Sequence, residues 1–168
     1  MSCKLQKMLF TKLFLSLCFM NLNLLPLSVA QNSPEDILKA HNELRAEVGV
    51  SPLVWNETLA TYAQDYVEKR KGDCEMEYST GVYGENLASG DGSMNIADAV
   101  KFWAEEKSDY DHASNKCISG GTDCFHYTQV VSRLSTSVGC GKTKCANGWD
   151  YVICSYFPPG NIEGQRPY

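Results

Sequence analysis

The sequence lacks a long apolar run, and it is short of histidine and of positive charge. Its 168 residues include three histidines, and 15 lysines and arginines stand against 20 aspartates and glutamates. The main apolar stretch, Leu13 to Met20, is soon interrupted by Asn21 and Asn23. A membrane-spanning helix needs about 20 apolar residues. The sequence therefore argues against a membrane anchor.

The first thirty residues have the pattern of a secretory signal peptide. Three lysines among the first twelve residues form a basic start, an apolar region follows, and Ser28–Ala30 supplies the small residues of a cleavage site. The alternative is an N-terminal membrane anchor, which the short apolar region disfavours. We expect residues 1–30 to be removed, so that the exported protein begins at Gln31.

Removal of this segment makes the chain more acidic. Three lysines and no acidic residues leave, so the formal charge changes from −5 to −8. An acidic surface offers little to phosphate backbones or anionic lipids, and we expect no nucleic-acid partner. Residues 31–168 are enough for one domain with a substantial core, and we expect a monomer.

Six cysteines remain in the exported chain once Cys3 and Cys18 have left. They are Cys74, Cys117, Cys124, Cys140, Cys145 and Cys154. An even number of cysteines in an exported chain predicts three disulfides. A zinc cluster is the alternative, but no pair has the two-residue spacing of a zinc knuckle.

Three segments carry helix signals and three others resemble strands. The helices are expected at 33–49, 56–72 and 95–110, with Ser33, Asn56 and Asn95 as N-caps. The strands are expected at 127–131, 137–141 and 149–156. Helices followed by strands, without a βαβ alternation, predict an α+β layered fold.

His41 lies on the apolar face of the first helix, which favours a buried histidine with a backbone or carboxylate partner over a ligand.

The turn between the last two strands suggests how the cysteines pair. Asn147-Gly148 is a strong two-residue hairpin signal, and it places Cys140 opposite Ser155. A one-residue bulge would bring Cys140 opposite Cys154. Cys145 then points to the other sheet face, toward Cys74, while Cys117 and Cys124 close a short loop on themselves. Fifteen pairings are possible, and the pattern favours this one.

Six blocks of the chain, in order, resemble the plant pathogenesis-related protein 1 family of the CAP superfamily (SCP domain). They are HNELRAEVGVSPLVWNETLATYAQDY, YGENLASG, FWAEEK, HYTQVV, VGCGKTKCANGWDYVICSY and GNIEGQRPY. The resemblance implies a three-layer α–β–α sandwich with an antiparallel central sheet and three disulfides with the pairing given above. It also implies export to the apoplast or the vacuole.

The same resemblance implies a central cavity lined by two histidines and two glutamates, which binds a divalent metal in some members. Glu85, Glu106 and His126 match three of these positions, and Tyr78 stands where the first histidine is expected. A phenol is a poorer zinc ligand than imidazole at neutral pH, so we expect zinc to bind weakly or not at all. The alternative for His126 is a histidine at a strand edge with carboxylate partners. His112 replaces a tyrosine of the family, and Phe125 and Ser132 also depart from its pattern.

Three functions follow from the resemblance. The first is a secreted defence protein that acts by binding against fungi, oomycetes or bacteria. Its partner is a pathogen surface component or a sterol. The loop expected to bind a sterol runs from Trp103 to His112 and includes Tyr110. Because that loop is polar, we expect weak sterol affinity at most.

The other two functions use different parts of the chain. The tail, 158–168, matches a signalling peptide that relatives release, which here would need a cut between Phe157 and Pro158. A strap that packs on the sheet is the alternative for this tail. A metal-dependent hydrolase with Glu85 or Glu106 as general base is the third and least favoured function.

Asn56-Glu57-Thr58 is an N-glycosylation acceptor, in which the cap role of Asn56 competes with a glycan.

Overall fold

The computed structural model describes residues 32–168, so the expected signal peptide and Gln31 lie outside the described residues. The helices are α2 (Pro34–Glu47), α3 (Glu57–Arg70), α4 (Ile96–Glu105), α5 (Phe125–Val130) and the 3₁₀ helix η1 (Glu106–Asp109). The strands are β1 (Val54–Trp55), β2 (Gly84–Gly90), β3 (Tyr110–Asp111), β4 (Lys116–Cys117), β5 (Ser137–Lys144) and β6 (Asp150–Phe157).

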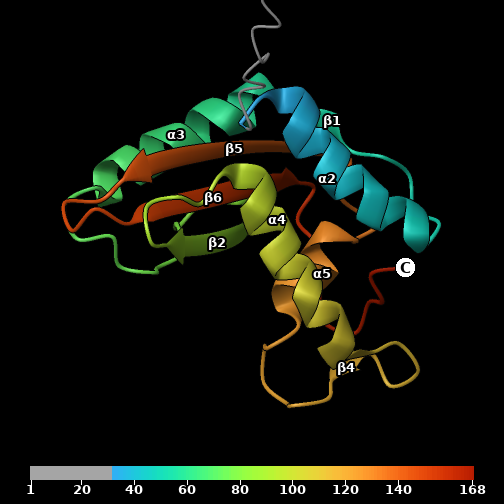
Figure 1. The fold of residues 1–168 in the computed structure, drawn as a ribbon. Coiled ribbons are helices and arrows are strands. Elements are labelled where there is room, and N and C mark those ends of the chain that lie inside the picture. Colours follow the sequence, from blue (N-terminus) through green and yellow to red (C-terminus); the bar gives the residue numbers. More distant parts are fainter. Residues whose placement is uncertain (1–31) are drawn as a thin grey trace, which may run out of the picture.

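The elements form three layers around a four-stranded sheet with the order β1-β5-β6-β2 (Figure 1). Helix α3 packs on one face, and helices α2, α4 and α5 lie on the other. Successive residues of β6 belong to two separate cores: Ile153 packs with α3, whereas Val152 and Cys154 pack with the other helices. The α–β–α sandwich is therefore confirmed. The central sheet is antiparallel except for β1, which runs parallel to β5.

The helix starts follow the local capping signals. The Oγ atom of Ser33 accepts a hydrogen bond from the Asp36 amide, and the Oδ1 atom of Asn56 accepts one from the Thr58 amide at 2.9 Å. Asn95 caps α4 in the same way. The third helix was expected to reach residue 110. It ends as an α-helix at Glu105 and continues as η1.

The predicted strand at 127–131 is wrong, because this segment belongs to helix α5. Its backbone bonds are helical: the Thr128 and Val131 amides donate to the carbonyls of Cys124 and Tyr127 at 3.1 Å each, four residues earlier in the chain. The backbone amides of His126 and Tyr127 donate to the Oε2 atom of Glu106 at 2.9 and 3.2 Å. A carboxylate from a distant segment thus accepts hydrogen bonds from the free amides in the first turn of the helix. This contact outweighs the strand preference of the β-branched residues.

Strand β2 was not expected, because glycines stand at both of its ends and weaken a strand. It pairs with β6 along its whole length, from Gly84 opposite Tyr156 to Gly90 opposite Asp150. On its outer edge, the Leu87 carbonyl accepts a hydrogen bond from the indole of Trp103 at 2.9 Å. Tertiary contacts on both sides therefore hold β2 in place.

The hairpin between β5 and β6 brings the expected cysteines together. Its loop has three residues rather than two, because the Cys145 amide bonds to the Trp149 carbonyl and Gly148 adopts a φ of 86°. The extra residue shifts the register as the expected bulge would, so Cys140 lies directly opposite Cys154. The disulfides are Cys74–Cys145, Cys117–Cys124 and Cys140–Cys154.

Candidate binding site

His126 lies in the first turn of α5 and is held at both ring nitrogens. Its Nδ1 atom is 2.6 Å from the Oε1 atom of Glu106, and its Nε2 atom is 3.2 Å from the hydroxyl of Tyr78. The ring stacks on Trp103 with 6.1 Å between the ring centroids. In the neutral imidazole, Nδ1 donates to the Glu106 carboxylate, which can only accept, and Nε2 accepts from the Tyr78 hydroxyl.

Tyr78 occupies the place of the expected first histidine as a neutral phenol. Tyr78 is 55% exposed, but the partial burial of its hydroxyl raises the pKa, and the nearby carboxylates of Glu106 and Glu85 raise it further. A protonated phenol donates its proton to His126 and does not present a phenolate to a cation. The position of the expected first histidine is therefore filled by a hydrogen-bond donor, which bonds to the Nε2 atom of His126.

The two carboxylates are also engaged by the protein. Both oxygens of Glu106 accept hydrogen bonds from His126 or the α5 backbone. Glu85 accepts from the Ser79 amide at 2.8 Å and from the Ser79 hydroxyl. Glu85 and His126 line one cavity of about 190 Å³, together with Tyr78. We call it the Tyr78 cavity; Glu106 does not line it.

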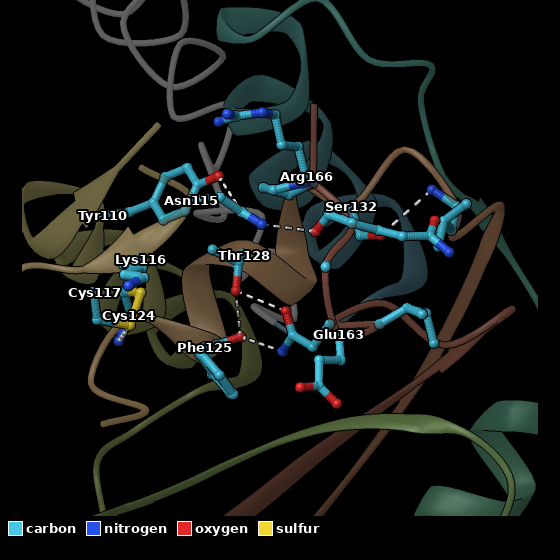
Figure 2. Close-up of a pocket in the computed structure, with 16 residues that line it drawn as sticks. Tyr110, Asn115, Lys116, Cys117, Cys124, Phe125, Thr128, Ser132, Glu163 and Arg166 are labelled. Carbon is cyan, nitrogen blue, oxygen red and sulfur yellow. Dashed lines mark hydrogen bonds between the residues drawn. A yellow bond between two sulfur atoms is a disulfide. The ribbon is translucent and has the colours of Figure 1, made fainter. Parts of the chain in front are cut away.

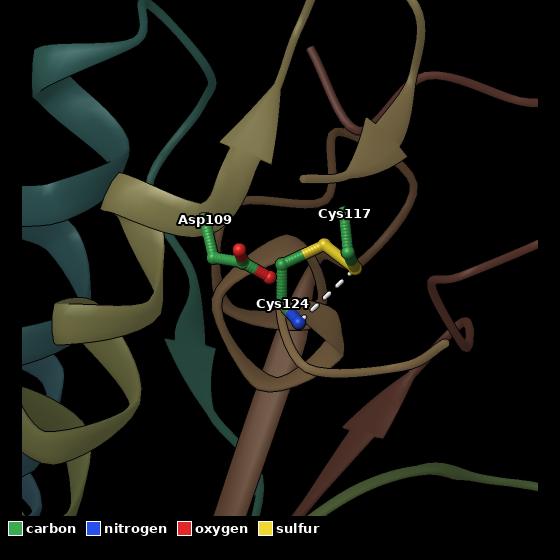
Figure 3. A group of neighbouring side chains, drawn as sticks. All are labelled: Asp109, Cys117 and Cys124. Carbon is green, nitrogen blue, oxygen red and sulfur yellow. Dashed lines mark hydrogen bonds between the residues drawn. A yellow bond between two sulfur atoms is a disulfide. The ribbon is translucent and has the colours of Figure 1, made fainter. Parts of the chain in front are cut away.

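The residues present fit a divalent cation poorly. Among residues 32–168, the one group of three ligand-type side chains whose ligand atoms lie within 4.8 Å of one another is Asp109, Cys117 and Cys124 (Figure 3). The two cysteines are joined in a disulfide, so they offer no thiolates. Glu85 and His126 do not belong to such a group. Glu85 and His126 supply the cavity with one carboxylate and one imidazole, fewer than the three protein ligands of a catalytic zinc site.

A second cavity of about 200 Å³ lies between β4, α5 and the C-terminal tail (Figure 2). We call it the tail cavity. Tyr110, from the expected sterol loop, lines it. Trp103 does not, and its assignment to a ligand-binding loop needs correction: its side chain is fully buried in the core and bonds to the Leu87 carbonyl. His112 stacks on Tyr168 with ring centroids 4.8 Å apart.

The tail, residues 158–168, is attached to the body near both of its ends. The Gly160 amide donates to the side chain of Gln129 at 2.9 Å, and the Pro167 carbonyl accepts from the Arg133 amide at 2.7 Å. The expected cleavage bond follows Phe157, whose carbonyl accepts from the Thr136 amide at 3.0 Å. A protease would need the end of β6 to open before it could cut there.

Comparison with known proteins identifies the family. The model of the cysteine-rich secretory protein family, CAP, matches residues 38–156. The chain belongs to the CAP family. It is 52% identical to the basic form of pathogenesis-related protein 1 of Nicotiana tabacum, over 84% of this chain and 78% of that protein. It is 47% identical to pathogenesis-related leaf protein 4 of Solanum lycopersicum, over 95% and 99%.

Solved CAP structures show the same fold. Schistosoma mansoni venom allergen-like protein 4 shares 28% identity with a TM-score of 0.64, over 80% of this chain and 92% of that one. NaASP2, solved with Zn²⁺, shares 23% identity with a TM-score of 0.68, over 83% and 86%. In the described part of this CAP protein, residues 32–168, none of the helices has the length and apolar character to cross a bilayer.

Two residues of this CAP site were not singled out from the sequence. The backbone amide and the hydroxyl of Ser79 donate hydrogen bonds to the two carboxylate oxygens of Glu85. Asn86 donates to the His126 carbonyl at 3.0 Å and to the Tyr156 hydroxyl. Each directly follows a candidate residue, Tyr78 or Glu85, and this adjacency was the only signal.

Asn56 can cap α3 and still offer its glycan-bearing atom. The Oδ1 atom accepts the amides of Thr58 and Leu59, whereas a glycan attaches to Nδ2. The two roles therefore use different atoms, and glycosylation of this CAP protein at Asn56 stays a prediction.

His41 is a buried structural histidine in the core of the CAP fold. Its Nδ1 atom donates to the Ile37 carbonyl at 2.8 Å, and its Nε2 atom accepts from the Tyr156 hydroxyl at 2.9 Å. Burial lowers the pKa of the imidazole from 6.5 to about 4. The ring is therefore neutral in the folded protein at pH 7.

Stability should fall between pH 6.5 and pH 4 because of His41. In this range the unfolded chain binds a proton at this residue and the folded protein does not, so acid favours unfolding. The fall of the His41 pKa from 6.5 to about 4 corresponds to about 3 kcal/mol, since each pKa unit is worth about 1.4 kcal/mol. Urea unfolding of the wild type and His41→Gln at several pH values tests this. The wild type should show the steeper loss; parallel curves would contradict the assignment.

Proposed function

We propose that the chain is exported after loss of residues 1–30 and acts in plant defence by binding, without catalysing a reaction. Its relatives, which are named pathogenesis-related proteins, support the defence role. The hydrogen bonds of the candidate residues support a role without catalysis: Glu85 and Glu106 accept hydrogen bonds from protein groups at both carboxylate oxygens, and both ring nitrogens of His126 are hydrogen-bonded. A general base must lie within hydrogen-bond reach of the substrate proton. Glu106 does not line the cavity and both ring nitrogens of His126 are bonded to protein groups, so Glu85 has no free acid–base partner beside it.

The proposed targets are surface components of fungi, oomycetes or bacteria in the apoplast or the vacuole. Sterol is a weak candidate, because each cavity holds about 200 Å³ and ligand pockets for drug-sized molecules measure about 300–1,000 Å³. The Tyr78 cavity and the tail cavity suit small or segmented polar ligands better than a rigid apolar one.

Growth inhibition with and without metal tests this function. Purified residues 31–168 should slow the growth of at least one fungus, oomycete or bacterium to the same extent before and after treatment with EDTA. Tyr78→His should gain zinc by metal analysis, because it restores a second imidazole beside His126, and should inhibit growth as the wild type does. Tyr83→His is the matched control, since Tyr83 contacts Tyr62 and Phe157 instead of His126.

Two results would contradict the proposal. Inhibition that disappears with EDTA and returns with zinc would indicate metal-dependent chemistry. The absence of inhibition against all three classes of organism would exclude direct antimicrobial action.

A further inference from the structure

The Tyr78 cavity and the tail cavity share a wall. Phe125 and Asn161 line both of them, so the two cavities lie on either side of one ridge. The side chain of Phe125 is 43% exposed. Asn161 is fixed against it, because its Nδ2 atom donates to the Phe125 carbonyl at 2.8 Å and its Oδ1 atom accepts from Thr128 at 2.7 Å. The ridge is thus an exposed aromatic ring on a rigid support.

We propose that these two cavities form one cleft for an uncharged oligosaccharide, with one sugar ring on each side of Phe125. This names a ligand class for the binding role proposed above and rests on that role. The cleft extends from Tyr78 at one end to Arg166 at the other. In Figure 2, Phe125 and Glu163 lie at one side of the tail cavity, and Tyr110 and Arg166 lie at the opposite side.

The division of the cleft favours a segmented ligand. Each cavity measures about 200 Å³, which is small for a drug-sized molecule but suits a single six-membered ring. A sterol is one rigid body and would have to pass over the ridge without bending. An oligosaccharide has rotatable bonds between its rings, so it can follow the ridge and place a ring in each cavity.

The lining chemistry favours an uncharged, hydroxyl-rich ligand. Tyr110 and Phe125 present aromatic surface that can cover the apolar face of a sugar ring. The neutral amide side chains in the lining are Asn115, Asn161 and Gln165. Those of Asn115 and Asn161 bond to protein groups at both oxygen and nitrogen, and each keeps a second N–H and a second lone pair for a ligand hydroxyl. Among residues 32–168, the carboxylate of Glu163 has no hydrogen-bond or ion-pair partner, so it is available to accept from a hydroxyl. The lining carries two carboxylates, Glu85 and Glu163, and two cations, Lys116 and Arg166, so neither sign of charge dominates, which favours an uncharged ligand.

The backbone along the ridge disfavours a peptide as the occupant. Recognition of an extended peptide by strand addition relies on free main-chain amides and carbonyls. The Phe125 amide donates to the Thr122 carbonyl at 2.9 Å, and the Phe125 carbonyl accepts from Asn161. The Gly160 amide is bonded to Gln129. Side chains are therefore the groups that remain for recognition.

Calorimetric titration with sugars of increasing length tests the proposal. The probes are β-1,4-linked N-acetylglucosamine and β-1,3-linked glucose oligomers of one to six units, added to residues 31–168. Affinity should rise at least tenfold between one and two units and then level off, because two rings occupy the cleft. Phe125→Ala should weaken the trimer about tenfold, equivalent to roughly 1.4 kcal/mol, and Glu163→Gln should weaken it several-fold.

Phe102→Ala is the matched control. Phe102 is 53% exposed on α4 and lines neither cavity, so its loss should leave sugar affinity unchanged. The proposal is overturned if folded wild-type protein binds none of the oligomers, if affinity is independent of length, or if Phe102→Ala and Phe125→Ala weaken binding equally. Binding of a tryptic peptide pool that is lost in Phe125→Ala, with no sugar binding, would assign the cleft to peptides instead.

The growth assay separates this inference from the proposed function. Growth inhibition without sugar binding would overturn only the ligand class. Sugar binding without inhibition of any organism would overturn the direct antimicrobial role and leave the cleft in place.

Discussion

Gly139→Ala should lower the free energy of unfolding by about 3 kcal/mol or prevent folding altogether, since overpacking a core costs about 1–3 kcal/mol and occasionally more. A Cβ atom at Gly139 would lie 2.1 Å from the backbone nitrogen of Ala60 and 2.7 Å from the carbonyl oxygen of Asn56. Both atoms belong to the first turn and the cap of α3. Because they are backbone atoms, they cannot rotate away as a side chain would.

Gly141→Ala should have a similar effect for the same reason. Its Cβ atom would lie 2.5 Å from the backbone nitrogen of Gln64, one helical turn further along α3. Gly139 and Gly141 are two residues apart on β5, so they face the same side of the sheet. The backbone of α3 therefore rests directly on this strand, which larger residues would not permit.

Denaturant unfolding of both variants beside Gly72→Ala measures the effect. A Cβ atom at Gly72 meets nothing within 4 Å, and its φ is not positive, so this control should change stability by about 0.5 kcal/mol at most or increase it slightly. Equal unfolding midpoints for Gly139→Ala and Gly72→Ala would show that α3 does not contact the strand through its backbone.

The parts of the fold that were predicted correctly depend on local signals. Ser33, Asn56 and Asn95 cap the three long helices because a cap and its partners lie within three residues in the sequence. The cysteine pairing also follows from a local feature, the turn at Asn147-Gly148, although its loop is one residue longer than expected.

The elements that were missed depend on distant partners. Helix α5 begins where it does because Glu106, twenty residues away, accepts the first amides of the helix. Strand β2 holds its glycines in an extended form because β6 and Trp103 flank it. Local propensity opposes both outcomes, and only the assembled layers reverse it.

For the candidate site, the sequence singled out candidate residues but not how their side chains bond. The positions of Glu85, Glu106 and His126 came from the resemblance, as did the replacement at Tyr78. The hydrogen bond between the Tyr78 hydroxyl and the Nε2 atom of His126 depends on the path of the loop before β2. The sequence of that loop has no repeating pattern from which its path could be predicted. The tail cavity was missed because its walls come from three segments that are separate in sequence.

Arg45→Met should lower the free energy of unfolding by about 3–5 kcal/mol, the range expected when a buried charged group that satisfies several partners is removed. The side chain of Arg45 is 1% exposed. Its Nε atom donates to the Ser51 carbonyl at 2.8 Å, and its two terminal nitrogens donate to the carbonyls of Val130, Ser132 and Ser135 at 2.9 Å each. Methionine would fill the space and leave these acceptors without their donors.

A lysine at this position should restore only part of the stability. Burial lowers the pKa of Arg45 to about 10, so the guanidinium stays charged at neutral pH and its planar fork reaches acceptors on two sides. One ammonium group donates at most three hydrogen bonds from a single point. Thermal unfolding should therefore rank the wild type above Arg45→Lys and Arg45→Met lowest.

Arg133→Met is the matched control for this series. Arg133 is exposed, and only its backbone amide makes a hydrogen bond within residues 32–168, so its replacement should change stability by about 0.5 kcal/mol at most. Because Arg45 bonds to the end of α5, the Arg45 variants should also disturb His126 at the start of that helix, whereas Arg133→Met should not. Imidazole NMR signals of His126 would report this: an unshifted signal in folded Arg45→Lys would show that the anchoring of α5 does not depend on the buried guanidinium.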